Sequence, residues 1–376
     1  MDTERSDQKT IRRGRGVRLS TEAPADTPPA APPPDDRPLT RGRGLRLSTE
    51  ASADAPPAVP PPDDRPLTRG RGLRLSTEAP ADAPPAAPPP AIAFLLDALW
   101  LSSGKVAYRQ AGAGPALLLL HDAGATSRIW RGVAAALADV RTSYALDLPG
   151  SGGTPPRAAP PTLKTLADAT IAFADALGLG RFDLCGHGLG AAVAALVAAR
   201  YPDRIGRLVL SNLGARPFAP DLLALEWTRA PLDLSLGLAR PFFDFWQPWN
   251  RQLFQLPPLN IWLSAQSLHR QPADQELWRE FLADHAATDG RAYLTTLTAA
   301  GVPQLHAALR TISAPTLLVA GDNDRIARLA EVERCQQLVP DSRLVVLEDC
   351  GHLPMIEVPD VYQQTVRDFL VGTQVA

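Results

Sequence analysis

The sequence predicts an α/β protein with a mostly parallel central sheet flanked by helices. Three observations predict this class: short continuous apolar runs, amphipathic helical patterns between them, and polar or glycine-rich loops where the runs end. Strands that alternate with helices along a chain form parallel sheets covered on both faces. Because ligands bind beyond the carboxyl ends of such strands, we expect functional residues in the loops that follow them.

The elements follow one another from residue 91 onward. Residues 105–112 alternate like a strand, and residues 115–124 begin with "PALLLL", a run expected of a strand buried on both faces. Residues 162–180 form an amphipathic pattern that ends at glycine, as helices often do. Further strand-bearing segments are expected at 142–153, 181–186, 204–212, 314–324 and 342–352, and further helices at 127–138, 189–201 and 358–371.

Residues 1–90 are expected to be a disordered tail. They contain no Phe, Trp, Tyr or Cys and hold 19 of the 39 prolines, so they cannot bury enough apolar surface to offset chain entropy. They also form a tandem repeat, because "RGRG" recurs at residues 13, 41 and 69 with a period of 28. We interpret the tail as a solvated tether, and the folded domain as residues 91–376.

A helical cap is predicted over about residues 213–306. The strand–helix alternation stops there, and the stretch is too long for a simple connection. It holds five of the seven tryptophans, which either form the core of the cap or line a pocket.

Composition narrows the possible partners. The net charge of −2 gives no global attraction to nucleic acid, and three cysteines fit a reducing compartment better than a disulfide framework. The N-terminus lacks the apolar segment of a secretory signal, and the apolar stretches are too short to span a membrane. We expect a cytoplasmic protein that acts on an apolar small molecule and carries no cofactor and no metal. The oligomeric state stays open.

Six motifs then appear in a recognisable order: "LLLLHDAG", "ALDLPGSG", "CGHGLG", "RYPDRIGRLVLSN", "GDNDRIA" and "EDCGHLPMIEVPD". Over about residues 95–371 the chain thereby resembles the α/β-hydrolase fold family, in its esterase and epoxide-hydrolase-like branch. The resemblance implies a nucleophile on a sharp strand-to-helix turn, then an acid, then a histidine.

Carried over to this chain, the resemblance places the acid at Asp324 and the base at His352. The nucleophile position is Gly188, which has no side chain, so covalent acyl transfer from this position is impossible. The oxyanion-hole donors would be the backbone N–H of Leu189 and that of Asp122 or Ala123. Glycine suits the strained turn better than serine does.

Other side chains offer substitutes for the missing serine. Cys185 and Cys350 are small residues expected to be buried and unreactive, and His187 is expected to be structural. Ser264 and Ser267 of the cap have no feature that favours them.

Asp122 is a second departure, because the family has glycine after the histidine. A carboxylate here would oppose negative charge in the oxyanion hole. Asp122 is either a loop residue that points to solvent or to an arginine, or an additional acid–base group.

Three functions fit these residues. The favoured one is a hydrolase- or lyase-type enzyme in which His352, oriented by Asp324, acts as general base without a covalent acyl intermediate. The second is a catalytically silent pseudohydrolase that binds a small molecule. The third is a conventional hydrolase with an unrecognised nucleophile. Replacing Gly188 by serine would distinguish a site that lacks only its hydroxyl from one that has been reshaped.

Overall fold

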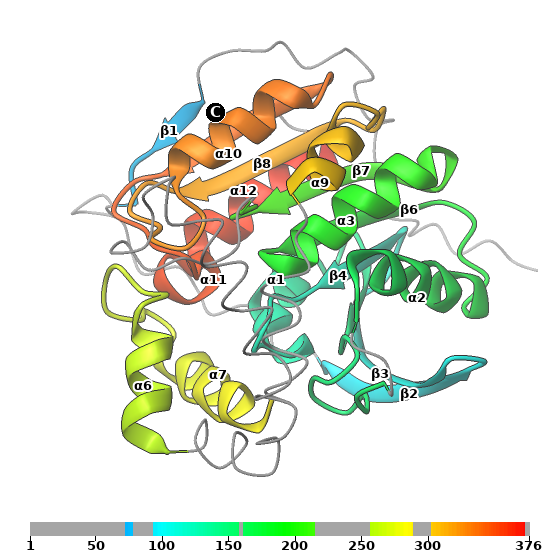
Figure 1. Cartoon of the computed structure of the whole chain (residues 1–376), viewed down its shortest axis with the longest axis horizontal. Helices are drawn as coiled ribbons and strands as arrows, with labels where there is room; N and C mark the ends of the chain where they lie inside the picture. Colours follow the sequence, from blue (N-terminus) through cyan, green and yellow to red (C-terminus); the bar gives the residue numbers. More distant parts are fainter. Residues whose placement is uncertain (1–71, 78–92, 158–160, 215–255, 289–301, 373–376) are drawn as a thin grey trace, which may run out of the picture. The chain divides into compact units, whose positions relative to one another are not determined.

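The computed structural model describes residues 72–77, 93–157, 161–214, 256–288 and 302–372, all within one compact unit that spans Pro60–Ala376. Within these residues the strands form one sheet in the order β1-β9-β8-β7-β6-β4-β5-β3-β2 (Figure 1). The strands are β1 (Leu73–Leu75), β2 (Leu95–Leu101), β3 (Gly104–Ala111), β4 (Ala116–Leu120), β5 (Thr142–Leu146), β6 (Phe182–His187), β7 (Ile205–Ser211), β8 (Thr316–Gly321) and β9 (Ser342–Leu347).

Helices cover both faces of this sheet, which confirms the predicted fold class. One layer contains α2 (Leu163–Ala176), α3 (Leu189–Arg200), α9 (Val302–Leu309) and α10 (Leu329–Leu338). The other contains the 3₁₀ helix η1 (Ser127–Trp130), α1 (Arg131–Ala136), α11 (Pro354–Glu357) and α12 (Pro359–Val371). A short 3₁₀ helix, η2 (Pro202–Arg204), precedes β7.

Strand β4 shows how the sequence builds these layers. Its leucines are all fully buried; Leu118 and Leu120 pack into the first layer, whereas Leu117 and Leu119 pack into the second. Successive side chains of a strand point to opposite faces, so a strand covered on both sides is apolar throughout.

The parallel pairing brings the carboxyl ends of the central strands to one edge. The sheet is parallel except where β3 pairs with β2 and β5 in antiparallel fashion. In register, Leu120 pairs with Gly186, His187 pairs with Ser211, and Gly321 pairs with Leu347. The loops that begin at residues 121, 188, 212, 322 and 348 therefore leave the sheet side by side.

The edge strand β1 comes from the segment predicted to be disordered. Leu73–Leu75 belong to the third copy of the repeat and pair in parallel with Val345–Leu347 of β9. Leu75 is partly buried against the apolar core beneath α1 and α12. This copy of the repeat therefore packs an apolar side chain onto the folded domain. The prediction of disorder therefore does not hold for residues 72–77, and the rest of the predicted tail up to residue 92 lies outside the described residues.

Helices α6 (Pro257–Ala265) and α7 (Gln275–Ala287) lie within the predicted cap, whereas α9, which begins within the predicted range, packs against α3 in the first helical layer of the sheet. Helix α7 packs against η1 and α11, and the Oγ1 of Thr126 donates to the Oδ2 of Asp284 at 2.5 Å. Of the five cap tryptophans, Trp278 stacks on Phe281 with ring centroids 5.5 Å apart, whereas Trp262 is 60% exposed. Trp227, Trp246 and Trp249 lie outside the described residues.

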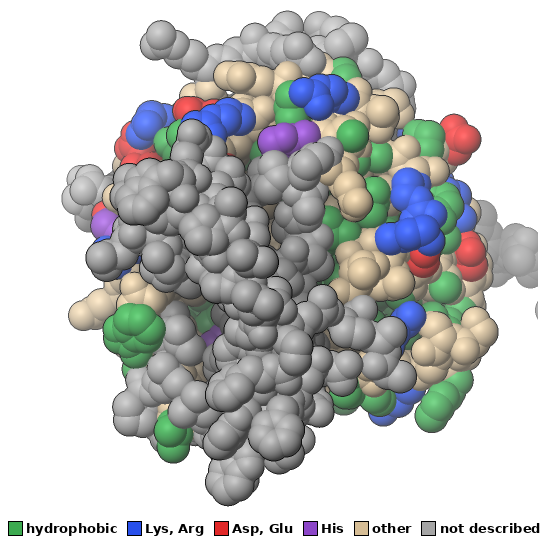
Figure 2. Space-filling view, viewed as in Figure 1, with side chains coloured by type: hydrophobic (Ala, Val, Ile, Leu, Met, Phe, Trp, Pro, Cys, Tyr) green, Lys and Arg blue, Asp and Glu red, His purple; other side chains and the backbone are tan. Residues whose placement is uncertain are grey.

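The described surface has no membrane-spanning element and mixes its charges. None of the described helices is long and apolar enough to cross a bilayer. On the face shown in Figure 2, basic and acidic side chains of the described residues are interspersed with uncharged ones. This distribution agrees with the small net charge of the chain.

Glycine allows α3 to approach β4 closely. An ideal Cβ at Gly190 would overlap the carbonyl oxygen of Leu120, which is backbone and cannot move aside. An ideal Cβ at Gly132 in α1 would instead overlap the Nε2 of Gln363, which is the end of a flexible side chain.

We therefore expect Gly190→Ala to lower the free energy of unfolding by about 1–3 kcal/mol or more, although alanine is the better helix former. The matched change Gly132→Ala should leave stability within about 1 kcal/mol of the wild type or raise it slightly. Denaturant unfolding measures both. Equal stability of the two variants would contradict the close approach of α3 to β4.

Candidate functional site

A sharp turn joins β6 to α3 at the carboxyl edge of the sheet. Gly188 has φ +54° and ψ −115°, in the left-handed half of conformational space, where side chains are strained. Its N–H donates to the carbonyl of Ser211 at 3.0 Å, and its carbonyl accepts from Ala191 and Ala192 in the first turn of α3. The turn thus presents residue 188 at the point where a strand becomes a helix.

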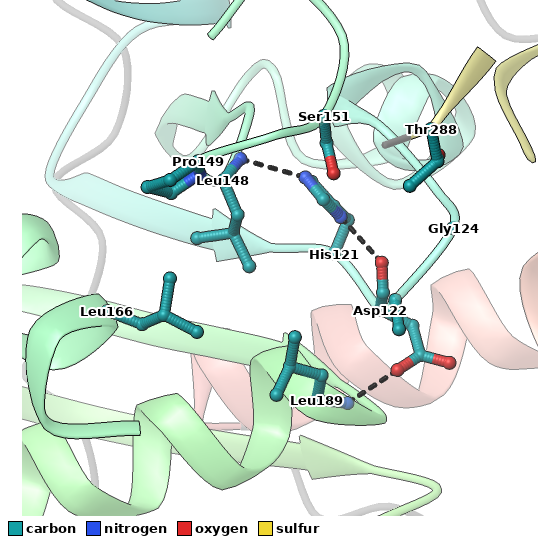
Figure 3. Close-up of a pocket in the computed structure, with 10 residues that line it drawn as sticks. His121, Asp122, Gly124, Leu148, Pro149, Ser151, Leu166, Leu189 and Thr288 are labelled. Atoms are coloured by element: carbon teal, nitrogen blue, oxygen red, sulfur yellow. Dashed lines mark hydrogen bonds between the residues drawn. The ribbon is translucent and has the colours of Figure 1, made fainter. Parts of the chain in front are cut away.

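The carboxylate of Asp122 occupies the space beside Gly188. An ideal Cβ at position 188 would overlap both the Cγ and the Oδ1 of Asp122. The Oδ1 accepts a hydrogen bond from the backbone N–H of Leu189 at 2.6 Å, as Figure 3 shows. The interpretation of Asp122 as a loop residue directed to solvent or to an arginine is therefore wrong. The N–H of Leu189, predicted as an oxyanion donor, already holds a carboxylate oxygen.

His352 lies between two carboxylates. Its Nδ1 is 2.7 Å from the Oδ2 of Asp324, and its Nε2 is 3.1 Å from the Oδ2 of Asp122. Ionised carboxylates only accept hydrogen bonds, so both ring nitrogens must donate and the ring must be an imidazolium. The three side chains come from the loops after β4, β8 and β9.

The pKa values of this group follow from its contacts. Burial lowers the pKa of His352, but the charge of Asp324 and the hydrogen bonds of both carboxylates raise it to about 10. Burial raises the pKa of Asp122, but the hydrogen bond and charge of His352 bring it down to about 2. At neutral pH the pair is ionised. His352 is therefore an acid in this state, and it can act as the predicted general base only after it has given up this proton.

Asp324 is held rigidly by its surroundings. Its Oδ1 accepts from the N–H groups of Ile326 at 2.7 Å and Ala327 at 3.0 Å, and its Oδ2 accepts from the Nδ2 of Asn212 at 2.8 Å. Burial raises its pKa, but these bonds and the charge of His352 keep the pKa below its usual value. Asp324 thus stays ionised and fixes the orientation of the imidazole.

His121 fixes the backbone that carries Asp122. The N–H of Leu148 donates to the Nε2 of His121 at 2.9 Å, so that nitrogen is an acceptor. The Nδ1 then carries the proton and donates to the carbonyl of Asp122 at 2.7 Å (Figure 3). Burial lowers the pKa of His121, which agrees with a neutral ring. Its place in "LLLLHDAG" was visible in the sequence, but its role in orienting the next residue was not.

Glu357 fixes the loop that carries His352, and the sequence analysis missed it. Its buried carboxylate accepts from the N–H groups of Gly351, Leu353, His269 and Arg270 at 2.8–3.2 Å. These bonds join the loop after β9 to the segment after α6. A glutamate within the apolar stretch "LPMIEVP" was the available signal, because a buried carboxylate needs several donors.

The other candidates lie away from this chemistry. The thiols of Cys185 and Cys350 are fully buried, and burial raises the pKa of both, so neither is a reactive thiolate. The hydroxyl of Ser264 in α6 lies within hydrogen-bonding distance of Asn260 and of His285 in α7. Ser267 meets the site through its backbone, because its carbonyl accepts from the N–H of His352 at 2.9 Å.

His187 is hydrogen-bonded to the backbone of His352. Its Nε2 donates to the carbonyl of His352 at 2.7 Å, so the ring contacts the backbone of that loop. Burial first, and then the charge of His352, lower the pKa of His187 to about 4, so this ring is neutral.

Asp122, His187 and His352 are also close enough to be considered as a metal site. One possible ligand atom from each lies within 4.8 Å of the other two. The sequence predicted no metal, because no His/Cys cluster in it has the spacing of a zinc site. The Nε2 of His352 and the Oδ2 of Asp122 are, however, engaged with each other, so a cation could bind only after this contact opened. We assign the two atoms to the ion pair.

A pocket lies beside Asp122 at the carboxyl edge of the sheet. It is a small hollow, partly open to solvent, with room for about one water molecule. Its lining includes Asp122, Leu148, Pro149, Leu166, Leu189 and Thr288 (Figure 3). The described lining therefore combines one carboxylate with mostly apolar walls.

Known proteins share this architecture. A family model described as the alpha/beta hydrolase fold matches residues 115–359. A pimeloyl-[acyl-carrier protein] methyl ester esterase from Nitrosomonas europaea is 29% identical over 67% of this chain and 94% of its own length. One of the same name from Aromatoleum aromaticum is 30% identical over 69% and 99%. The crystal structure of a membrane phospholipase A, described as a bacterial virulence factor, superposes with a TM-score of 0.60 at 28% identity, over 76% of this chain and 87% of that one.

The overlap at position 188 predicts the outcome of restoring serine. Gly188→Ser alone should displace Asp122 and lower the free energy of unfolding by about 1–3 kcal/mol, because the residue has a positive φ. It should react poorly with a fluorophosphonate. The double variant Gly188→Ser with Asp122→Gly should react well, because the hydroxyl then has room beside His352. Equal labelling and stability of the single and double variants would show that Asp122 does not compete for this space.

The ion pair predicts a titration. His352 faces Asp122, Asp324 and neutral His187, and Asp122→Asn should lower the pKa of His352 from about 10 by roughly 1–3 units. NMR of the ring can follow it. Because the folded pKa lies above the unfolded value of about 6.5, the contribution to stability is complete below pH 6.5 and is lost as the pH rises through 10. An unchanged titration in Asp122→Asn would contradict the contact.

Proposed function

Because the chain belongs to the alpha/beta hydrolase family, we propose that it is a small-molecule hydrolase that works without a serine, through Asp122, His352 and Asp324. One observation carries the proposal. A carboxylate occupies the place beside the turn at residue 188 and contacts both groups that would serve a nucleophile there, the N–H of Leu189 and the Nε2 of His352. The site therefore holds a charged oxygen where the glycine offers none.

The cost of burying these charges favours an enzyme. The side chains of His352 and Asp324 are 3% and 0% exposed, and taking such charges out of water costs several kcal/mol per ion before the attraction between them is counted. Well-packed apolar residues would serve a simple binding pocket at no such cost. Strongly shifted pKa values on groups that border a pocket are characteristic of catalytic sites.

His352 serves first as an acid in this proposal. As an imidazolium it can protonate a developing alkoxide, and this leaves it neutral. The neutral ring, still oriented by Asp324, can then take a proton from water. The predicted general base thus acts in the second half of the reaction. A lyase would use the same acid and base for elimination, but the relatives named as esterases favour hydrolysis.

The alternative is a binding protein without catalysis, and one observation favours it. The N–H of Leu189 is already hydrogen-bonded to Asp122, so an incoming substrate oxygen cannot use it while Asp122 stays in place. In that case the group would be a closed ion pair, and the pocket would hold a ligand beside it.

Turnover separates the two. The purified chain should hydrolyse at least one member of a panel of uncharged esters, lactones and epoxides, and His352→Ala should reduce the rate at least about 100-fold, the lower range for loss of a general acid–base. Asp122→Asn is measured in the same assay. Asp349→Asn is its matched control, since it makes the same change on an exposed residue.

Thermal shift with the same compounds completes this test. Ligands that raise the melting temperature of both the wild type and His352→Ala, without turnover by either, would identify a binding protein. Turnover that persists in His352→Ala would remove the proposed catalytic group.

A further inference from the structure

We propose that the edge of β9 is a docking site for the repeat motif of this chain, and that the first two copies of the motif compete with the third copy for this edge. The motif is six residues long and comprises residues 72–77 of the third copy, which contain β1 at one end of the sheet (Figure 1). The matching residues are 44–49 in the second copy and 16–21 in the first. This inference is independent of the proposed function.

Backbone pairing holds the third copy on β9. The two strands are parallel, with Leu73 beside Val345 and Leu75 beside Leu347. After the strand ends, the N–H of Glu348 donates to the carbonyl of Leu75 at 3.0 Å. When an extended segment is added to the edge of a sheet, such main-chain bonds supply affinity and the side chains supply specificity.

The second half of the motif makes specific side-chain contacts. Leu75 is partly buried against the apolar core beneath α1 and α12. The Oγ1 of Thr77 donates to the carbonyl of Glu348 at 2.8 Å and accepts from the Nη1 of Arg270 at 3.2 Å. The edge therefore selects an apolar side chain and, two residues later, a hydroxyl.

The first half of the motif is selected by charge and by space. The Nη1 of Arg74 lies 3.8 Å from the Oδ2 of Asp322 and 4.0 Å from the Oε1 of Glu348. These pairs are partly exposed, so they favour a basic residue more than they stabilise the fold. An ideal Cβ at Gly72 would lie only 3.0 Å from the side chain of Leu344, so glycine lets the segment begin close against β9.

The first two copies carry the same contact residues. Residues 44–49 read Gly-Leu-Arg-Leu-Ser-Thr and are identical to residues 72–77. Residues 16–21 differ only by Val17 in place of Leu73, and Leu73 is 37% exposed. The contacts that hold the third copy therefore do not distinguish it from the second, and they tolerate the single difference in the first.

The length of chain between each copy and the sheet sets the outcome of the competition. Residues 78–94, 50–94 and 22–94 separate the third, second and first motifs from β2, which is 17, 45 and 73 residues. The cost of closing a loop rises only with the logarithm of its length. With equal contacts, the second copy should therefore occupy the edge about four-fold less often than the third, and the first about nine-fold less often.

The same arithmetic favours occupants from the same chain. A segment that is linked to its site is present at an effective concentration on the order of millimolar, which exceeds the concentration of a second chain in dilute solution. When the third copy leaves, the second is therefore its replacement. The repeat thereby keeps the edge of β9 covered, whereas an uncovered edge strand would be a template for pairing with other chains.

Hydrogen exchange of the full chain tests the competition, because the exchange of a paired amide follows the fraction of molecules in which the pair is open. Leu75→Asp removes the apolar anchor of the third copy. It should raise the exchange rate of the peptide that contains the Glu348 amide by about four-fold, since the second copy takes over. The triple variant Leu19→Asp, Leu47→Asp, Leu75→Asp should raise it further, to the rate of an uncovered edge.

The matched control keeps the third copy intact. Leu19→Asp with Leu47→Asp makes the same change twice, and it should leave the exchange rate within about two-fold of the wild type, because the third copy dominates the competition. Exchange in α3 should be the same in all four chains, which shows that each of them remains folded.

Cross-linking identifies the copy that replaces the third. Glu50→Cys lies directly after the second motif and leaves it intact, and Glu348→Cys lies at the end of the docking site. A short bismaleimide should join these two thiols within one chain, and adding Leu75→Asp should raise the yield about four-fold. Glu348→Cys alone is the control, since the native thiols are buried.

Each outcome decides the proposal. Equal exchange in Leu75→Asp and in the triple variant would show that the copies are not interchangeable. Equal exchange in the triple variant and in the wild type would show that the motif does not cover β9. Cross-links that join two chains, seen as dimers on a denaturing gel, would overturn occupancy by the same chain. Since none of these measurements involves turnover, they leave the proposed function untouched.

Discussion

The ion pair between Asp122 and His352 is the interaction on which the candidate site depends. It accounts for the glycine at position 188, since the carboxylate fills the space of a side chain there. It accounts for the occupied N–H of Leu189, since the second oxygen of the same carboxylate lies on it. Together with the charge of Asp324, which is the larger influence, it keeps His352 a cation at neutral pH. Without the carboxylate of Asp122, the space beside Gly188, the N–H of Leu189 and the Nε2 of His352 would each lack the group that now contacts it.

The scaffold places this pair by register and by close approach. Parallel pairing of β4, β6, β8 and β9 brings their following loops to one edge. Glycine at position 190 lets α3 begin against the backbone of β4, which brings the N–H of Leu189 within reach of the loop after that strand. Two further side chains restrict the two loops. His121 donates to the carbonyl of Asp122, and Glu357 accepts from backbone N–H groups of the loop that carries His352. The geometry of the pair is therefore set by backbone contacts on both sides.

The fold was predictable from sequence because its signals are local. Apolar runs such as "ALLLL" and glycines at turns identify elements one at a time, and the family resemblance orders them. The side-chain arrangement was predictable only where a motif carried it, as for Asp324 and His352. The direction of Asp122 was not, because it depends on an empty volume created 66 residues later at Gly188. The edge strand β1 was not predicted for a similar reason, since its three residues form a strand only by pairing with β9.

The position of an oxygen, rather than the residue that supplies it, decides what this site can do. A hydroxyl at the turn needs a neutral imidazole to take its proton, so an imidazolium would stop the first step. A carboxylate is already ionised. The group that then requires a proton is the substrate oxygen on which negative charge develops. The raised pKa of His352, which would silence a serine nucleophile, thus places a proton donor beside a carboxylate that is already ionised.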